Sequence, residues 1–233
     1  MKASKKAYII VIIVLSHLTG HSTISYGQQH YIGFTGGYNM GKFFNFSIDP
    51  GYSSKFQLKS GFSADSFYET KNMPALSLRV GLQYNYQEAD IEISVNEGHS
   101  SSYTKLDYSF HLLKLNSNLV FQVFERNNLK LNVLFGPEFS YTINTKAKGE
   151  GWTYYSASTG EKQYWKKDER NSKDLYNFNF GVDLGLEFIV PVRNQLDFLI
   201  QNRFEILMTK VFGLHIPLFT GSIQVGLRYN LNK

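Results

Sequence analysis

The chain has 233 residues, of which 16% are aromatic and none is cysteine, and its formal charge at pH 7 is +5. Without cysteine it has no disulfide bond and no thiolate metal site, and a mean hydropathy of -0.27 excludes a bundle of transmembrane helices. Because three of the positive charges are lysines among the first six residues, the rest of the chain is nearly neutral and lacks the basic footprint of a nucleic-acid-binding protein.

The N-terminal segment has the layout of a cleavable secretory signal. The lysines are followed by an apolar run over residues 7–18 and by a small-x-small site that ends at Gly27. This run is too short for a spanning helix, which needs about 20 apolar residues. We therefore expect residues 1–27 to be removed and residues 28–233 to form one domain. Because the chain has no cysteine, the signal is not of the lipoprotein type.

Stretches of alternating apolar and polar residues follow and predict eight β-strands. The last stretch is the clearest, because Ile223, Val225 and Leu227 alternate with Gln224 and Gly226. A period of two is that of a strand with one apolar and one polar face. The predicted strands span residues 31–41, 55–68, 75–87, 105–124, 129–145, 175–190, 196–209 and 218–231.

The connections between these strands alternate in length. Short turns are predicted at residues 69–74, 125–128 and 191–195, and longer or more polar loops at residues 42–54, 88–104, 146–174 and 210–217. In outer-membrane barrels the short turns face the periplasm and the longer loops face the outside of the cell. An even number of strands then places the N-terminus and the C-terminus of the barrel domain on the periplasmic side.

The residue types indicate which face of the strands is inside. In the predicted sixth strand, Val182 and Leu184 alternate with Asp183 and Glu187. If the apolar faces pointed inward, as in a soluble lipocalin-like barrel, their large side chains would overfill an eight-stranded lumen. The sequence thus predicts an all-β, eight-stranded antiparallel up-and-down transmembrane β-barrel with a packed polar lumen. We expect a monomer, integral to the cell outer membrane, whose apolar faces contact outer-membrane lipid.

This orientation places a set of charged residues in the lumen: Arg79, Glu138, Asp183, Glu187, Arg203, Glu205 and Arg228. They must pair, because an isolated buried charge costs several kcal/mol. We expect the arginines at positions 203 and 228 to neutralise carboxylates of this set. A catalytic or proton-conducting group is the alternative to a structural salt-bridge plug, but carboxylates alone do not supply a nucleophile and its base.

Several segments resemble a known family. They are residues 32–39 (Ile-Gly-Phe-Thr-Gly-Gly-Tyr-Asn), 111–116 (His-Leu-Leu-Lys-Leu-Asn), 134–141 (Leu-Phe-Gly-Pro-Glu-Phe-Ser-Tyr), 180–188 (Phe-Gly-Val-Asp-Leu-Gly-Leu-Glu-Phe) and 226–231 (Gly-Leu-Arg-Tyr-Asn-Leu). In their order and spacing they resemble the PorT-like outer-membrane β-barrel family of Bacteroidetes. The resemblance implies an eight-stranded barrel of the cell envelope, in a family mostly without assigned function whose founding member is linked to type IX secretion. It implies no catalytic residues.

The predicted third long loop contains a group of aromatic residues: Trp152, Tyr154, Tyr155 and Trp165. With the charged residues around them they could bind a surface glycan or a strand of an envelope protein. Alternatively, the strands continue beyond the bilayer as a hairpin and the aromatic side chains pair across it.

One pair of residues raises an enzymatic alternative. Ser109 and His111 are two positions apart in a predicted strand, and with a carboxylate they could form a lipid esterase triad. The alternation slips near this pair, however, and a β-bulge explains the slip without chemistry. No phosphate-binding loop or metal-ligand motif is present.

We therefore expect no enzyme activity, no metal and no cofactor. The sequence favours a binding, structural or envelope-assembly role without an open general pore. The alternatives are an outer-membrane lipid-modifying enzyme and a component of type IX-like protein secretion.

The processing of the chain can be tested directly. N-terminal sequencing of protein from the outer-membrane fraction should give a start at or near Gln28, because signal peptidase cuts after a small-x-small site. A chain in that fraction that keeps Met1 would contradict the signal assignment.

Overall fold

The computed structural model describes residues 28–43, 52–97, 100–127, 129–155, 162–171, 178–211 and 214–232. These ranges consist of β-strands and short turns, and none of them contains a helix long and apolar enough to cross a membrane. The predicted signal, residues 1–27, lies outside the described residues.

The strands are long for a protein of this size. In chain order they are β1 (Gln29–Phe43), β2 (Tyr52–Met73), β3 (Leu76–Glu97), β4 (Ser100–Arg126), β5 (Leu129–Tyr155), β6 (Lys162–Asn171), β7 (Phe178–Arg193), β8 (Leu196–Val211) and β9 (Leu214–Asn230).

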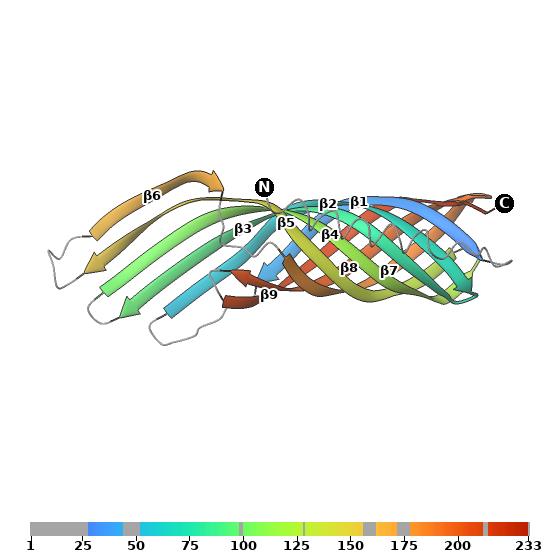
Figure 1. The fold of residues 1–233 in the computed structure, drawn as a ribbon, viewed down its shortest axis with the longest axis horizontal. Helices are drawn as coiled ribbons and strands as arrows, with labels where there is room; N and C mark the ends of the chain where they lie inside the picture. Colours follow the sequence, from blue (N-terminus) through green and yellow to red (C-terminus); the bar gives the residue numbers. More distant parts are fainter. Residues whose placement is uncertain are drawn as a thin grey trace.

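Eight of these strands close into an antiparallel barrel (Figure 1). Its strands follow chain order, from β1 to β5 and then from β7 to β9, and β1 closes the ring by pairing with β9. Each of the eight predicted strands corresponds to one of these, so the predicted fold class is confirmed. The additional strand, β6, lies in the segment that was predicted as the third long loop.

Three tight turns join strands at one end of the barrel. They contain Pro74 with Ala75, Asn127, and Asn194 with Gln195. Asn127 has a φ of 48°, a left-handed conformation that asparagine tolerates better than most residues. The turns lie where they were predicted but are shorter, because the strands on both sides continue into them.

At the opposite end, four strands continue well beyond the closed part of the barrel. Pairing of β2 with β1 ends at Gly61, and pairing of β5 with β7 ends at Tyr141. From there β2 to β5 run on together, and β6 pairs with β5. The result is a five-stranded sheet, here called the extension, which projects to the left in Figure 1.

The extension corrects the predicted loop boundaries. Residues 88–104 are almost entirely strand, since β3 and β4 pair from Leu76↔Phe121 up to Glu97↔Ser100. Much of residues 146–174 is strand as well, which agrees with the hairpin alternative for this segment. These segments were predicted as loops because they are rich in polar residues, but Ala89, Ile91 and Ile93 alternate with polar residues, as expected for an antiparallel strand with one solvated face. The loops predicted at residues 42–54 and 210–217 are partly strand, and their remainder lies outside the described residues.

In the closed part of the barrel, apolar side chains point outward and polar ones inward. On β7, Val182 and Leu184 are 37% and 48% exposed, whereas Asp183 and Glu187 are fully buried. This is the predicted parity. An outward apolar band with a polar interior is the arrangement of a barrel that spans a bilayer.

In the extension the preference of the two faces is reversed. The inward side chains there form an apolar cluster: Ala89, Ile91, Leu106, Tyr108, Phe110, Leu112, Ala147 and Leu207. This reversal is the cause of the slip in the β4 pattern, because inward positions change from Lys114 to Leu112 without a break in alternation. A bulge does occur next to His111, but its extra residue is Ile143 of β5, so the bulge expected in β4 lies on the partner strand.

The outward orientation can be tested with a single tryptophan. Leu184→Trp should place an indole in the lipid-facing band, so lipids with brominated acyl chains should quench its fluorescence strongly. The native Trp152 and Trp165 lie in the extension, and the unmodified protein is therefore the control that should show little quenching. Equal quenching of both proteins would contradict the assigned orientation.

Candidate functional site

The seven charged residues predicted for the lumen all lie inside the barrel, where each is at most 5% exposed: Arg79, Glu138, Asp183, Glu187, Arg203, Glu205 and Arg228. They form contacts across the lumen as well as between neighbouring strands. Three clusters, each built around one or two bases, account for these contacts.

The first cluster lies toward the turn end of the barrel. Arg79 of β3 is 2.6 Å from Glu69 of β2 and 2.7 Å from Glu187 of β7, so it joins opposite walls. Arg228 pairs with Asp197 at 2.7 Å and lies 3.5 Å from Glu69. None of the carboxylates expected for Arg228 forms a direct ion pair with it, although Glu187 attracts it at longer range. The β8–β9 register instead places Arg228 directly opposite Asp197, near the turn.

The second cluster lies further into the barrel. Arg203 of β8 pairs with Asp65 of β2 at 3.0 Å and with Asp183 of β7. Asp183 is one of the expected partners. The amide of Asn118 donates a further hydrogen bond to Asp183 at 2.7 Å. The guanidinium thus serves two carboxylates from opposite walls.

The third cluster is built around Lys114 of β4. Its ammonium nitrogen is 3.1 Å from Oε1 of Glu138 and also pairs with Glu205. The hydroxyl of Thr220 donates a hydrogen bond to Glu205 at 2.8 Å. Here again one base serves two carboxylates.

The sequence prediction missed four members of these clusters: Asp65, Glu69, Lys114 and Asp197. Asp65 and Glu69 share their parity with Ser63 on β2, and this was a usable signal of an inward face. Lys114 was obscured because it follows the point where the inner face of β4 changes from apolar to polar.

The inward residues of β8 show which side chains fill the lumen at each level. From the turn end to the extension they are Asp197, Leu199, Gln201, Arg203, Glu205 and Leu207. Leu199 packs with Phe67 and Ile189 across the lumen, and Leu207 belongs to the apolar cluster of the extension. Apolar contacts therefore lie on both sides of the second and third charge clusters.

The aromatic residues predicted as a binding group are split between the two faces of the extension. Trp152 is the direct cross-strand neighbour of Tyr103 on β4 and of Tyr164 on β6, so these three side chains share the outward face. We call them the aromatic row. The Tyr103 ring stacks on Trp152 with centroids 6.4 Å apart, and the Lys162 ammonium lies 4.2 Å from a ring centroid of Trp152.

Trp165 lies on the opposite, inward face. It pairs with Gly151, and a Cβ atom at that position would lie 2.5 Å from the Trp165 ring. Only glycine therefore allows the indole to cover the strand at this point. Tyr154 shares the outward parity of Trp152, and the side chain of Tyr155 lies outside the described residues. The four predicted residues thus do not form one platform.

On the outward face, between the aromatic row and the barrel, positively and negatively charged residues alternate from strand to strand. Direct cross-strand neighbours there are, from β2 to β6, Lys55, Glu92, Lys105, Glu150 and Lys166. Opposite charges placed in this way stabilise neighbouring strands. Closer to the barrel, a hydrogen bond with Asp90 raises the pKa of Lys59 above its ordinary value.

Comparison with known families places the chain in one of them. The family described as "Outer membrane protein beta-barrel domain" matches residues 26–213. The chain belongs to this family. It is therefore an outer-membrane β-barrel protein. In barrels of this kind the short turns face the periplasm and the longer connections face the outside of the cell.

Solved outer-membrane proteins resemble this β-barrel. Ail, the attachment invasion locus protein of Yersinia pestis, crystallised with the heparin analogue sucrose octasulfate, is 14% identical, with 86% of this chain and 99% of Ail covered and a TM-score of 0.42. Neisserial surface protein A is 14% identical, with 87% and 98% covered and a TM-score of 0.43. OprG of Pseudomonas aeruginosa is 9% identical, with 88% and 97% covered and a TM-score of 0.49. No protein with a curated description matches the chain in sequence.

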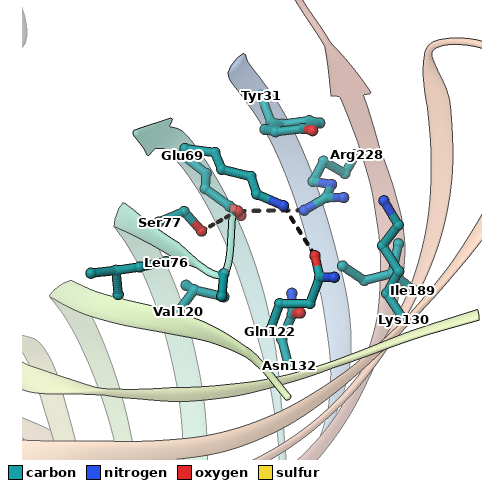
Figure 2. Close-up of a pocket in the computed structure, with 12 residues that line it drawn as sticks. Tyr31, Glu69, Leu76, Ser77, Val120, Gln122, Lys130, Asn132, Ile189 and Arg228 are labelled. Atoms are coloured by element: carbon teal, nitrogen blue, oxygen red, sulfur yellow. Dashed lines mark hydrogen bonds and ion pairs between the residues drawn. The ribbon is translucent and has the colours of Figure 1, made fainter. Parts of the chain in front are cut away.

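The periplasmic end of this outer-membrane barrel contains a polar hollow that is open to solvent. Figure 2 shows Glu69 between Ser77 and Arg228. Ser77 donates a hydrogen bond to Glu69 at 2.7 Å, and the Lys71 ammonium donates one to Gln122 at 3.0 Å. The hollow ends at the packed lumen, so it is a recess in the periplasmic face.

The structure also places the suspected esterase pair. Ser109 and His111 are on the outward face of β4, where Ser109 pairs with Glu88 of β3. Nδ1 of His111 is hydrogen-bonded to the hydroxyl of Tyr84 at 2.7 Å, and Glu88 accepts a hydrogen bond from Tyr86. Tyrosine hydroxyls thus occupy Nδ1 of His111, the atom that a triad carboxylate would contact, and Oε1 of Glu88.

The lumen clusters give a stability prediction. Arg203→Leu should leave Asp65 and Asp183 buried without their base, and breaking a buried pair in this way costs about 3–5 kcal/mol. The free energy of unfolding in lipid vesicles, or the heat-modifiable gel shift, measures the effect. Lys166→Leu on the exposed face of the extension is the control and should change stability little. Equal effects of the two substitutions would contradict the ion-pair assignment.

Proposed function

We propose that this outer-membrane protein is a surface binding protein, and that the outward face of its extension binds glycans. The observation that carries the proposal is the aromatic row, Tyr103, Trp152 and Tyr164, held side by side on three neighbouring strands. Regular strands with continuous register hold it, and a site on rigid elements keeps its geometry better than one on loops.

The chemistry of this face suits sugars. Aromatic rings offer a flat apolar surface with large buried area, and Tyr164 is 76% exposed. The charged residues directly below the row can hydrogen-bond hydroxyl groups. Apolar faces combined with nearby polar groups are the general requirements of a small-ligand site.

A protein strand is the less favoured ligand. It would add to one of the two edges of the extension, which are β6 and the first part of β2. The edge strand β6 carries Lys162, Lys166, Lys167 and Arg170 together with two acids, and this part of β2 carries Lys55 and Lys59. Charged residues on an edge strand are the means by which natural proteins prevent such pairing.

The remaining expectations belong to this proposal as well. The packed lumen supports a barrel without an open general pore, which anchors the extension in the membrane. The hydrogen bonds of His111 and Glu88 support a protein that is not an enzyme. A PorT-like assignment and a part in type IX-like secretion rest on the sequence resemblance alone.

The proposal can be tested with two faces of one sheet. Trp152→Ala should weaken binding of purified surface polysaccharide, measured with the folded barrel in nanodiscs, by about fivefold, because loss of an aromatic contact costs about 1 kcal/mol. Trp165→Ala removes the same side chain from the opposite face and should leave binding unchanged. Equal losses in both variants, or no polysaccharide or glycan-array binding by the unmodified protein, would contradict the proposal.

A further inference from the structure

The middle of the lumen contains more buried acid than base. Four carboxyl groups lie there, each at most 3% exposed: Asp65, Glu138, Asp183 and Glu205. Among the described residues, the bases that pair with them are Lys114 and Arg203. Toward the periplasm, the buried acids Glu69 and Glu187 face Arg79 and Arg228, and the third acid there, Asp197, is partly exposed. The excess of fully buried acid therefore lies in this middle region, here called the mid-barrel chamber.

Glu138 is the carboxyl of the chamber with the fewest hydrogen bonds to support a negative charge. Asp183 accepts hydrogen bonds from Asn118 and Arg203, Glu205 accepts them from Thr220 and Lys114, and Asp65 accepts one from Arg203. The base beside Glu138 is the Lys114 ammonium, 3.1 Å from Oε1 and shared with Glu205, and Oε2 of Glu138 has no hydrogen-bond partner among the described residues.

The charged groups that face Glu138 come from every wall around it. They are Lys114 of β4, Asp183 of β7, Arg203 and Glu205 of β8, and Asp65 of β2, which shares Arg203. Three of these groups are acids and two are bases. With Glu138 ionised, the chamber would hold two more negative than positive charges in a low-dielectric space, and such a state is strongly disfavoured.

The side chains at the two ends of the chamber limit which cation can balance the excess negative charge. Leu112 and Leu207 lie on the side of the extension, and Leu199 packs with Phe67 and Ile189 on the periplasmic side. These apolar contacts separate the chamber from the ions of bulk solvent. In the part of the chain that the structure describes, no three acidic or histidine side chains converge as metal ligands. A proton is therefore the cation that fits.

We propose that the mid-barrel chamber binds a proton at neutral pH and that Glu138 holds it as a neutral carboxylic acid. The proton removes one excess charge and gives Glu138 a hydrogen to donate. Oε1 of Glu205 and Oε1 of Gln83 are buried acceptors of the same chamber without a hydrogen-bond donor. Because a glutamic acid of the unfolded chain is ionised at neutral pH, folding takes up this proton, and the barrel loses stability as the pH rises.

Infrared spectroscopy of the folded barrel tests the proposal directly. At pH 7 the protein in deuterated buffer should show the carbonyl stretch of a buried neutral carboxylic acid, and Glu138→Gln should remove this band while it keeps the heat-modifiable gel shift of the folded barrel. Glu187→Gln is the matched control, because Glu187 accepts hydrogen bonds from Arg79, Asn132 and Gln201, and it should keep the band. Absence of the band in the unmodified protein, or its persistence in Glu138→Gln, overturns the proposal.

A second measurement keeps the test independent of band assignment. Between pH 7 and pH 9, the folding equilibrium constant of the unmodified protein should fall more steeply than that of Glu138→Gln, by up to about tenfold per pH unit for one proton. Parallel pH profiles would overturn the proposal. Stabilisation of the unmodified protein by added Na⁺ or Ca²⁺, lost in Glu138→Gln and independent of pH, would assign a metal ion to the chamber and would also overturn it.

Discussion

The structure depends on the need to satisfy polar side chains inside a narrow barrel that is surrounded by apolar ones. The outward face of each strand is apolar in its membrane-spanning part, so polar residues must point inward, where few partners are available. Arg79 joins β3 to β7, and Arg203 joins β8 to β2, so that ion pairs connect opposite walls. Such pairs add little net stability over apolar packing, but each becomes costly when one partner is lost. The charged residues of the lumen therefore depend on one another, because removal of one leaves its partner buried and unpaired.

The same strands change their chemistry where they leave the membrane. On β4, inward positions are polar at Lys114 and Asn116 and apolar at Leu112 and Phe110. The outward face changes in the opposite sense, from Leu113 and Leu119 in the barrel to charged residues in the extension. The alternation along β4 is therefore unbroken, but its apolar face points outward to lipid in the barrel and inward in the extension, where the polar face points to water.

The sequence was sufficient to predict the barrel because its signal is repeated. Every membrane-spanning strand alternates apolar outward with polar inward residues. The short turns contain Asn, Pro or other polar residues and recur at regular intervals. The charges on polar faces could be identified individually, but their partners could not, because a pair such as Arg203 with Asp65 depends on the tilt of strands across the lumen. Arg228 shows the same limit, since only the β8–β9 register reveals Asp197 as its neighbour.

The extension was missed because its segments were taken for polar loops, although Ala89, Ile91 and Ile93 alternate with polar residues. Between Glu88 and Thr104 the apolar residues are inward and the outward ones are charged, which resembles a polar loop. The aromatic group was found, yet its division between faces follows from the β5–β6 register, in which Trp152 meets Tyr164 and Gly151 meets Trp165.

Electrical conductance measures most directly whether the lumen of the barrel is packed and closed to ions. In a planar lipid bilayer the purified, folded barrel should give no steady conductance above that of a protein-free bilayer, because ion pairs and two apolar layers fill the path. A stable, reproducible open channel of the unmodified protein would contradict the packed lumen.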